Sequence, residues 1–182
     1  MLKYAALLRA VNVVGRNLVK MAELRARCDS VGIRNPQTYL QSGNLIFASK
    51  QTDPSRLVKR LEALIKKEFG FAGRVVIRNS TELAKIIKNN PMPSREQDPS
   101  RLAVMFLATR PAPDAFAGLR AALAGPEEFH LIGEELYLYY PNGMGQSKLT
   151  NTVLEKKLGT HGTVRNWNTV RKLYEMAENL GK

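Results

Sequence analysis

The feature of this sequence that most constrains its fold is an order of predicted elements that occurs twice. Hydrophobic spacing over residues 4–87 predicts a strand, a helix, two strands, a helix, a strand and one extra helix, and residues 102–179 predict the same order. The order β-α-β-β-α-β is that of the ferredoxin-like motif, a four-stranded antiparallel sheet with helices on one face. We therefore expect an α+β protein of two ferredoxin-like (βαββαβ plus extra helix) subdomains with antiparallel sheets.

Local signals place the elements of the first half. Gly43 supplies the positive φ that a tight hairpin turn needs, and Pro54 suits the first turn of a helix. Asn79 and Glu82 have the spacing of a capping box. The predicted strands are 4–11, 38–41, 44–48 and 74–77, and the predicted helices are 19–31, 53–69 and one that begins after Asn79.

The second half repeats these elements. Arg78-Asn79 and Arg165-Asn166 each join the last strand of one copy to its extra helix. This echo, together with the shared order, supports two copies of one unit. The predicted strands of the second copy are 102–109, 128–132, 136–140 and 163–164, and its predicted helices are 114–124, 147–158 and 168–179.

A proline-rich segment separates the two halves. Residues 89–99 contain three prolines among polar residues, a composition that continues neither a helix nor a central strand. We predict subdomains at 1–90 and 101–182, with a linker at 91–100. Positive charge is concentrated before this boundary: the formal net charge is +12, and residues 1–90 hold 17 lysines and arginines against 6 acidic residues. A basic subdomain of this kind indicates an anionic partner.

Composition excludes several classes of protein. Hydrophobic residues make up 44% of the chain and charged residues 24%, as in globular domains rather than disordered chains. The apolar run at residues 4–8 is too short for a membrane span, so we expect no membrane partner. Cys28 is the only cysteine, which indicates a reducing, cytoplasmic location. His130 and His161 are isolated, so we expect no metal and no cofactor.

A glycine-rich segment is the strongest local candidate for a binding site. Gly143 and Gly145 let a ligand approach the backbone, and Ser147 is placed to cap the predicted helix, whose free N–H groups attract anions. Lys148 lies in the first predicted turn, where the helix dipole disfavours a cation unless an anion is bound. The alternative is a glycine turn with an ordinary serine cap.

Two further groups of residues extend the candidate anion site. A second glycine-containing loop leads into the first helix, and a solvated polar loop is its alternative interpretation. In the other group a tryptophan ring lies beside cations and could stack on a base or sugar, although a lone tryptophan often anchors packing. The loop contributes Arg9, Asn12, Asn17 and Lys20, and the second group consists of Arg165, Asn166 and Trp167.

The helix predicted over residues 53–69 presents a basic face. Its apolar residues share one side and leave a strip of cations towards solvent. Such a strip suits the phosphates of a nucleic acid without reading its bases, and a solvated helix face explains it as well. The cations of this candidate nucleic-acid surface are Arg56, Lys59, Arg60, Lys66 and Lys67.

Separated motifs along the chain resemble one family. They are ALLRAVNV at 6–13, NLVKM at 17–21, QSGN at 41–44, and SKL at 147–149 with RNWNTV at 165–170. In this order they are similar to an uncharacterised bacterial domain-of-unknown-function family, whose members usually have glycine where this chain has Ala10. The resemblance implies an α+β fold of two ferredoxin-like parts and a bacterial cytoplasmic protein. It implies no established activity.

Three functions remain open at this point. The first is a protein that binds a polyanion or a phosphorylated ligand, with nucleic acid as one candidate, through basic residues and glycine-rich helix entrances. The second is a small enzyme that acts on a phosphorylated or nucleotide-like substrate. The third is a protein–protein interaction module. One concave pocket holding both motif groups would favour an enzyme, whereas a continuous basic surface would favour nucleic-acid binding.

Overall fold

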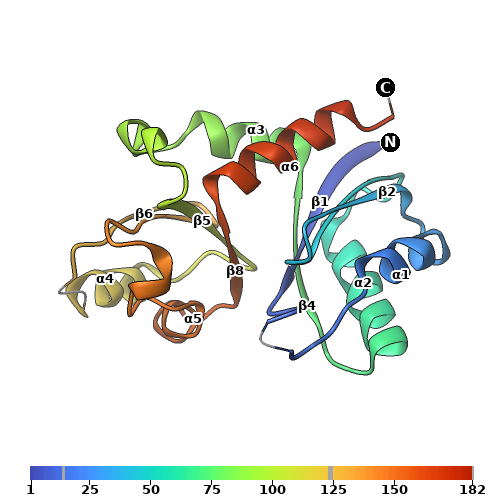
Figure 1. Cartoon of the computed structure of the whole chain (residues 1–182), viewed down its shortest axis with the longest axis horizontal. Helices are drawn as coiled ribbons and strands as arrows, with labels where there is room; N and C mark the ends of the chain where they lie inside the picture. Colours follow the sequence, from blue (N-terminus) through green and yellow to red (C-terminus); the bar gives the residue numbers. More distant parts are fainter. Residues whose placement is uncertain (14, 123–124, 182) are drawn as a thin grey trace. The chain divides into compact units, whose positions relative to one another are not determined.

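The computed structural model describes residues 1–13, 15–122 and 125–181, and each half of the chain forms a sheet with helices. In the first half the strands are β1 (Leu2–Arg9), β2 (Arg34–Tyr39), β3 (Asn44–Ser49) and β4 (Arg74–Asn79). The helices are α1 (Met21–Arg27), the 3-10 helix η1 (Cys28–Val31), α2 (Pro54–Phe69) and α3 (Ser80–Lys88). The strands pair antiparallel in the order β2-β3-β1-β4, and α1 and α2 lie on one side of them (Figure 1).

Helices α1 and α2 cover one face of this first sheet. Alternate residues of β1, namely Tyr4, Ala6 and Leu8, point to that face and pack in one core with α2. Burial of a leucine side chain contributes about 2 kcal/mol, so the apolar stripe of α2 determines which of its faces stays in water. The buried stripe is the predicted one: Leu57, Leu61, Leu64 and Ile65.

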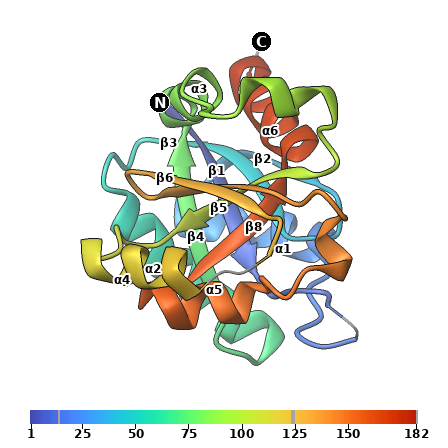
Figure 2. The ribbon, with the colours of Figure 1, turned by 90° about the vertical axis from the view of Figure 1, so that its left-hand side faces the viewer.

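The second half forms the same arrangement. Its strands are β5 (Leu102–Leu107), β6 (Glu128–Ile132), β7 (Glu135–Tyr139) and β8 (Gly162–Asn166). Its helices are α4 (Pro113–Ala122), the 3-10 helix η3 (Met144–Gln146), α5 (Asn151–Leu158) and α6 (Trp167–Asn179). The strand order is β6-β7-β5-β8, and α4 and α5 lie side by side on one face of the sheet (Figure 2). The predicted end of the first of these helices, residues 123–124, lies outside the described residues.

The two sheets have identical strand orders when the strands of each half are numbered along the chain. This is the order of a ferredoxin-like unit, in which the first and third strands form the central pair and the second and fourth strands form the edges. The predicted α+β fold with antiparallel sheets in two similar subdomains is therefore confirmed. Two copies of one ferredoxin-like unit account for it.

The junctions between the last strand and the extra helix are built alike in the two halves. Asn79 Oδ1 accepts from Glu82 N at 2.9 Å, and Glu82 Oε2 accepts from Asn79 N at 2.7 Å, which forms the predicted capping box. Asn166 Oδ1 accepts from Thr169 N at 2.8 Å and caps α6 in the same way. The preceding residues, Arg78 and Arg165, are both buried. The repeated Arg-Asn pair in the sequence therefore corresponds to a strand–helix junction that is built in the same way in both halves.

Contacts divide the chain into two compact units. The first contains Met1–Lys85 and Lys172–Lys182, and the second contains Ile86–Arg171. The divisions fall inside α3 and α6. The boundaries predicted from sequence, 1–90 and 101–182, treat each extra helix as part of one copy. These boundaries stay a prediction.

The proline-rich segment has contacts of its own within the second unit. Residues Pro93–Gln97 form the 3-10 helix η2, and Met92 before it is buried. Arg95 forms an ion pair with Glu128 at the start of β6, and its guanidinium lies 4.5 Å from the centroid of the Tyr139 ring. The segment expected to be an exposed linker is therefore attached to the second sheet.

Candidate functional site

The glycine-rich segment follows β7 and makes a sharp turn. Gly143 has φ +84° and ψ 147°, a conformation that only glycine adopts readily. Its N–H donates to Tyr140 O at 2.9 Å, and its own carbonyl accepts from Gln146 N at 3.2 Å. A side chain at Gly145 would meet open space, so that glycine is not required by packing. The turn needs one of its two glycines.

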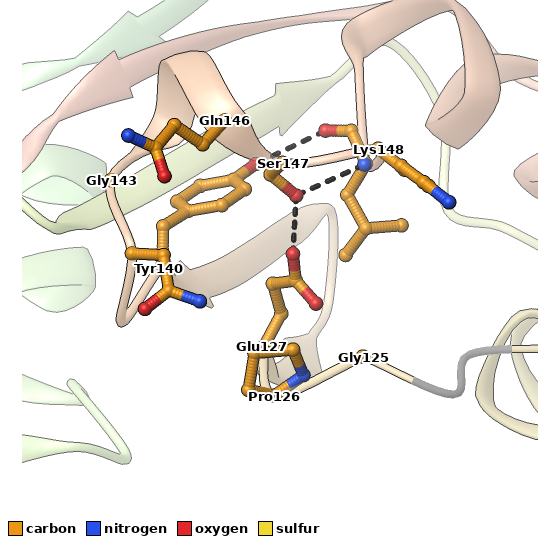
Figure 3. Close-up of a pocket in the computed structure, with 10 residues that line it drawn as sticks. Gly125, Pro126, Glu127, Tyr140, Gly143, Gln146, Ser147 and Lys148 are labelled. Carbon is orange, nitrogen blue, oxygen red and sulfur yellow. Dashed lines mark hydrogen bonds between the residues drawn. The ribbon is translucent and has the colours of Figure 1, made fainter.

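A cavity of about 450 Å³ lies beside this turn. Ser147 Oγ donates to Glu127 Oε1 at 2.5 Å and accepts from Leu149 N at 3.0 Å (Figure 3). Glu127 comes from the segment before β6, so this hydrogen bond joins the two sides of the cavity. The lining residues are Gly125, Pro126, Glu127, Tyr140, Asn142, Gly143, Gln146, Ser147, Lys148 and Leu149.

The prediction that Ser147 caps the following helix is wrong. Helix α5 begins at Asn151, and its cap is Thr150, whose Oγ1 accepts from Val153 N at 3.4 Å. Ser147 instead accepts from the N–H two residues ahead, which is a local turn that competes with helix formation. Ser147 and Lys148 therefore precede the helix rather than open it.

Electrostatics make this cavity a poor site for a polyanion. Glu127 places a carboxylate beside the Ser147 hydroxyl, while the Lys148 side chain is exposed and points away from that hydroxyl (Figure 3). Burial raises the pKa of the Tyr140 phenol, and the charge of Glu127 raises it further. A neutral phenol, a hydroxyl and one carboxylate suit a polar ligand that donates hydrogen bonds.

The loop between β1 and α1 is held by asparagine side chains. Asn12 Nδ2 donates to Val19 O at 3.0 Å and to Gln41 O at 2.7 Å, and Asn12 Oδ1 accepts from Val19 N at 2.8 Å. Asn17 Nδ2 donates to Ala10 O at 3.0 Å. Both asparagines have positive φ, which this residue type tolerates. Their amide groups bind the chain itself and give the loop its shape.

The same contacts join this loop to the hairpin turn of the QSGN motif. Leu8 N donates to Gly43 O at 2.8 Å. Gly43 has φ +80°, and a Cβ there would lie 2.5 Å from Val11 Cγ2 and 2.7 Å from Leu8 Cβ. Two motifs separated in the sequence thus form one structural site in the first unit. Of the predicted cations beside it, Lys20 is exposed and forms an ion pair with Glu23 at 3.0 Å.

In the third predicted group Arg165 and Trp167 are buried, and Asn166 is exposed. Trp167 is 0% exposed, so its ring has no free face for a base. Arg165 Nη1 donates to Thr163 Oγ1 at 2.6 Å and to Val164 O at 2.9 Å. Burial lowers the pKa of the Arg165 guanidinium to about 10. Together with the Asn166 cap, these contacts favour the packing interpretation of this group over stacking on a ligand.

The basic face of α2 is exposed as the sequence predicts. Its five cations recur at helical spacing opposite the buried stripe, and all five are exposed. Arg56 lies 3.5 Å from Asp53, and Lys67 lies 3.9 Å from Glu68, both near the ends of the helix. Within the described residues, Lys59, Arg60 and Lys66 form no ion pair. This face keeps a net positive charge along its centre.

A second cavity, of about 610 Å³, lies in the first unit and was missed by the sequence analysis. Arg34 from β2, Lys50 after β3 and Arg60 from α2 line it. None of these residues belongs to a glycine-rich motif. The one available signal was the hairpin: a turn at 40–43 places the start of β2 beside the end of β3, as the pairing of Arg34 with Ala48 shows.

Two classes of site find no support in the described residues. None of their helices is long and apolar enough to cross a membrane. Their His, Cys, Asp and Glu side chains form no group of three or more that could hold a metal ion. The described residues form polar cavities and a basic helix face on an α+β scaffold.

Comparison with known proteins identifies the family of this chain. Residues 1–137 match the family described as "Protein of unknown function (DUF1697)", and the chain belongs to this family, as its motifs predicted. A solved structure, described as that of conserved bacterial protein SP0830 from Streptococcus pneumoniae, is similar to this chain, with 23% identity and a TM-score of 0.78. The similarity covers 97% of this chain and 98% of that one and shows the shared fold. No curated protein matches the chain.

Proposed function

We propose that this protein binds polyanions, with nucleic acid as the principal candidate, through the exposed basic face of α2. The observation that carries the proposal is the row of cations on that face, whose central members form no ion pair in the described residues. The row consists of Arg56, Lys59, Arg60, Lys66 and Lys67.

The spacing of the row fits a phosphate backbone. At 1.5 Å per residue, the distance along the helix from Arg56 to Lys67 is roughly 16 Å. Duplex DNA carries one negative charge for about every 1.7 Å of its axis, so a helix face of this length lies beside several phosphates. The carboxylate of Glu62 does not lie among these cations, because it faces β4, where it accepts a hydrogen bond from Val75 N at 3.1 Å.

Binding of this kind is independent of base sequence. The face offers cations and no arrangement of paired donors and acceptors that would read base edges, so contacts to phosphates dominate. A cytoplasmic location belongs to the same proposal, since the single cysteine is buried and forms no disulfide. Polyanion binding also accounts for the concentration of charge in the first half of the chain.

Titration with labelled oligonucleotides at two salt concentrations tests the proposal. The variant Lys66→Glu/Lys67→Glu reverses two charges in the last turn of α2. We expect its affinity for single and double strands to fall at least tenfold at low salt. We also expect the salt dependence to become shallower, by about 0.9 in log–log slope per lost contact on duplex and 0.7 on single strands.

The second unit offers a matched control. Lys156 and Lys157 also lie in the last turn of a helix that ends at glycine, so Lys156→Glu/Lys157→Glu makes the same change in charge in the last turn of another helix. We expect this control to retain most of its affinity. Absence of binding by the wild-type chain at low salt, or equal losses in the two variants, would overturn the proposal.

A further inference from the structure

The cavity of the first unit lies at the end of its sheet where β1 and β2 begin and β3 ends. Three cations reach it from different elements: Arg34 from β2, Lys50 from the segment after β3, and Arg60 from α2. The other described lining residues are uncharged in their side chains, and no carboxylate is among them: Met1, Gly32, Asn35, Ser49 and Gln51.

A hydrogen bond to the backbone places Arg60 at this cavity. Its Nη1 donates to Val31 O at 3.4 Å, across the turn that ends η1. Gly32 makes this position accessible: it has φ +78°, and a Cβ there would lie 3.2 Å from Arg60 Nη1. A side chain at residue 32 would therefore crowd the guanidinium. With glycine at this position, the guanidinium has room to lie against the backbone at the edge of the cavity.

Hydrogen bonds tie together the residues at the base of the cavity. Ser49 is 1% exposed, and its Oγ donates to Gly32 O at 3.1 Å and accepts from Gln51 N at 3.1 Å. Gln51 in turn accepts from Asp53 N at 3.0 Å and, through its carbonyl, from the Tyr4 hydroxyl at 2.9 Å. These bonds tie the segment that carries Lys50 to the sheet and to the start of α2.

Arg34 is available to a ligand. Its Nη1 lies 3.1 Å from Asp29 Oδ1, but the two side chains are 60% and 72% exposed. Exposed ion pairs of this kind contribute little and exchange readily, since water competes for both charges. A doubly charged ligand that also meets Lys50 and Arg60 would displace Asp29. The cavity then presents two guanidinium forks and one ammonium group.

We propose that this cavity binds a phosphomonoester group. A phosphomonoester carries a charge near −2 at neutral pH and three acceptor oxygens, whereas a backbone phosphodiester carries only −1. Three cations that converge on one concavity match the charge of a phosphomonoester. A linear row of cations, as on α2, matches a chain of phosphodiesters. Guanidinium forks bind phosphate oxygens in pairs, which adds directionality.

The inference rests on the proposed function and makes it more specific. Arg60 belongs both to the basic face of α2 and to the cavity. A nucleic-acid strand on the α2 face could therefore place its 5′-phosphate end in the cavity. A small phosphorylated molecule offers the same group without the strand. The two sources share one chemistry and differ in whether the α2 face contributes to affinity.

A pair of oligonucleotides tests the cavity. They have one sequence and differ only in a 5′-phosphate or a 5′-hydroxyl. We expect the wild-type chain to bind the phosphorylated strand about tenfold more tightly, the value of one well-formed hydrogen bond to a charged group. Arg34→Ala/Lys50→Ala should abolish that preference, because both residues line the cavity and neither belongs to the α2 face.

Two control variants separate the cavity from the basic face. Lys156→Ala/Lys157→Ala removes the same charge in the second unit and should keep the preference. Lys66→Glu/Lys67→Glu should lower the affinity for both strands and leave the ratio of the two affinities unchanged. Equal affinity of the wild-type chain for the two strands, or a preference that survives Arg34→Ala/Lys50→Ala, would overturn the phosphomonoester site while leaving binding by the α2 face intact.

A second experiment uses a small phosphorylated molecule in place of an oligonucleotide. Calorimetry compares the binding of a nucleoside 5′-monophosphate with that of the nucleoside. The site is supported, even if no oligonucleotide binds, when the wild-type chain binds the monophosphate, Arg34→Ala/Lys50→Ala does not, and Lys66→Glu/Lys67→Glu does. In that outcome the proposed polyanion function fails and the cavity stands alone. Absence of binding by both the monophosphate and the phosphorylated strand would overturn the inference.

Discussion

At the scale of single residues, the loop after β1 stores backbone strain. Ala10 has φ +52°, in the left-handed region that costs a residue with a Cβ roughly 1–2 kcal/mol. Asn12 and Asn17 share this conformation but recover part of the cost through side-chain hydrogen bonds, which alanine cannot form. Ala10 therefore carries strain that no side-chain hydrogen bond of its own offsets.

Ala10→Gly should stabilise the protein. Glycine adds entropy to the unfolded chain, which costs about 0.5–1 kcal/mol. Relief of the left-handed strain is larger, so the free energy of unfolding should rise by about 0.5–1 kcal/mol. Urea unfolding measures it as a higher midpoint. Ala26→Gly is the control, because Ala26 is exposed in α1 and the same change there should lower stability by a similar amount. A lower midpoint for both variants would contradict the strain at Ala10.

Cys28 should be unreactive in the folded protein. It is fully buried, and burial together with the charge of Asp29 raises the pKa of its thiol to about 12. The thiolate is the reactive form, so a thiol reagent at about pH 8 should modify Cys28 at the rate of unfolding. Rates measured with and without denaturant check this. A Cys28→Ser/Ser94→Cys variant, with its thiol at an exposed position, should react at once.

At the scale of elements, the ends of helices were harder to predict than their faces. The buried stripe of α2 follows from a spacing that recurs over several turns, so its prediction was correct. The start of α5 depends on whether Ser147 or Thr150 caps it, and both residues satisfy the local rule. Ser147 has Glu127 as a partner from another segment, a contact that sequence spacing does not contain.

The caps of the extra helices provide a test at this scale. Asn166→Ala should lower the free energy of unfolding by about 1 kcal/mol, because the Thr169 N–H loses its acceptor. Asn166→Asp keeps an acceptor oxygen and should restore the stability. Asn168→Ala, at an exposed position two residues further along α6, should leave the unfolding midpoint nearly unchanged. Equal losses in Asn166→Ala and Asn168→Ala would show that capping contributes nothing here.

At the scale of the whole molecule, the repeated order of elements was enough to predict the fold, whereas the charged cavity was not predictable from local pattern. Strand order follows from the β-α-β-β-α-β motif with little freedom. The cavity depends on Arg34, Lys50 and Arg60, which meet only because β2, β3 and α2 take particular registers. The glycine motifs, in contrast, are conspicuous in sequence and explain turns: Gly43 and Gly143 both have positive φ.

The junction between the two copies gives the last prediction. Prolines in 91–100 predict a protease-sensitive linker, but Met92 is buried and Arg95 contacts both Glu128 and the Tyr139 ring. Cleavage requires local opening of the segment, which these contacts oppose. Arg95→Ala should therefore speed cleavage within 89–101 several-fold, as measured by a broad-specificity protease and mass spectrometry. Lys88→Ala, at an exposed residue before the segment, should not. If wild-type and Arg95→Ala chains are cut there equally fast, the contacts of Arg95 do not hold the segment.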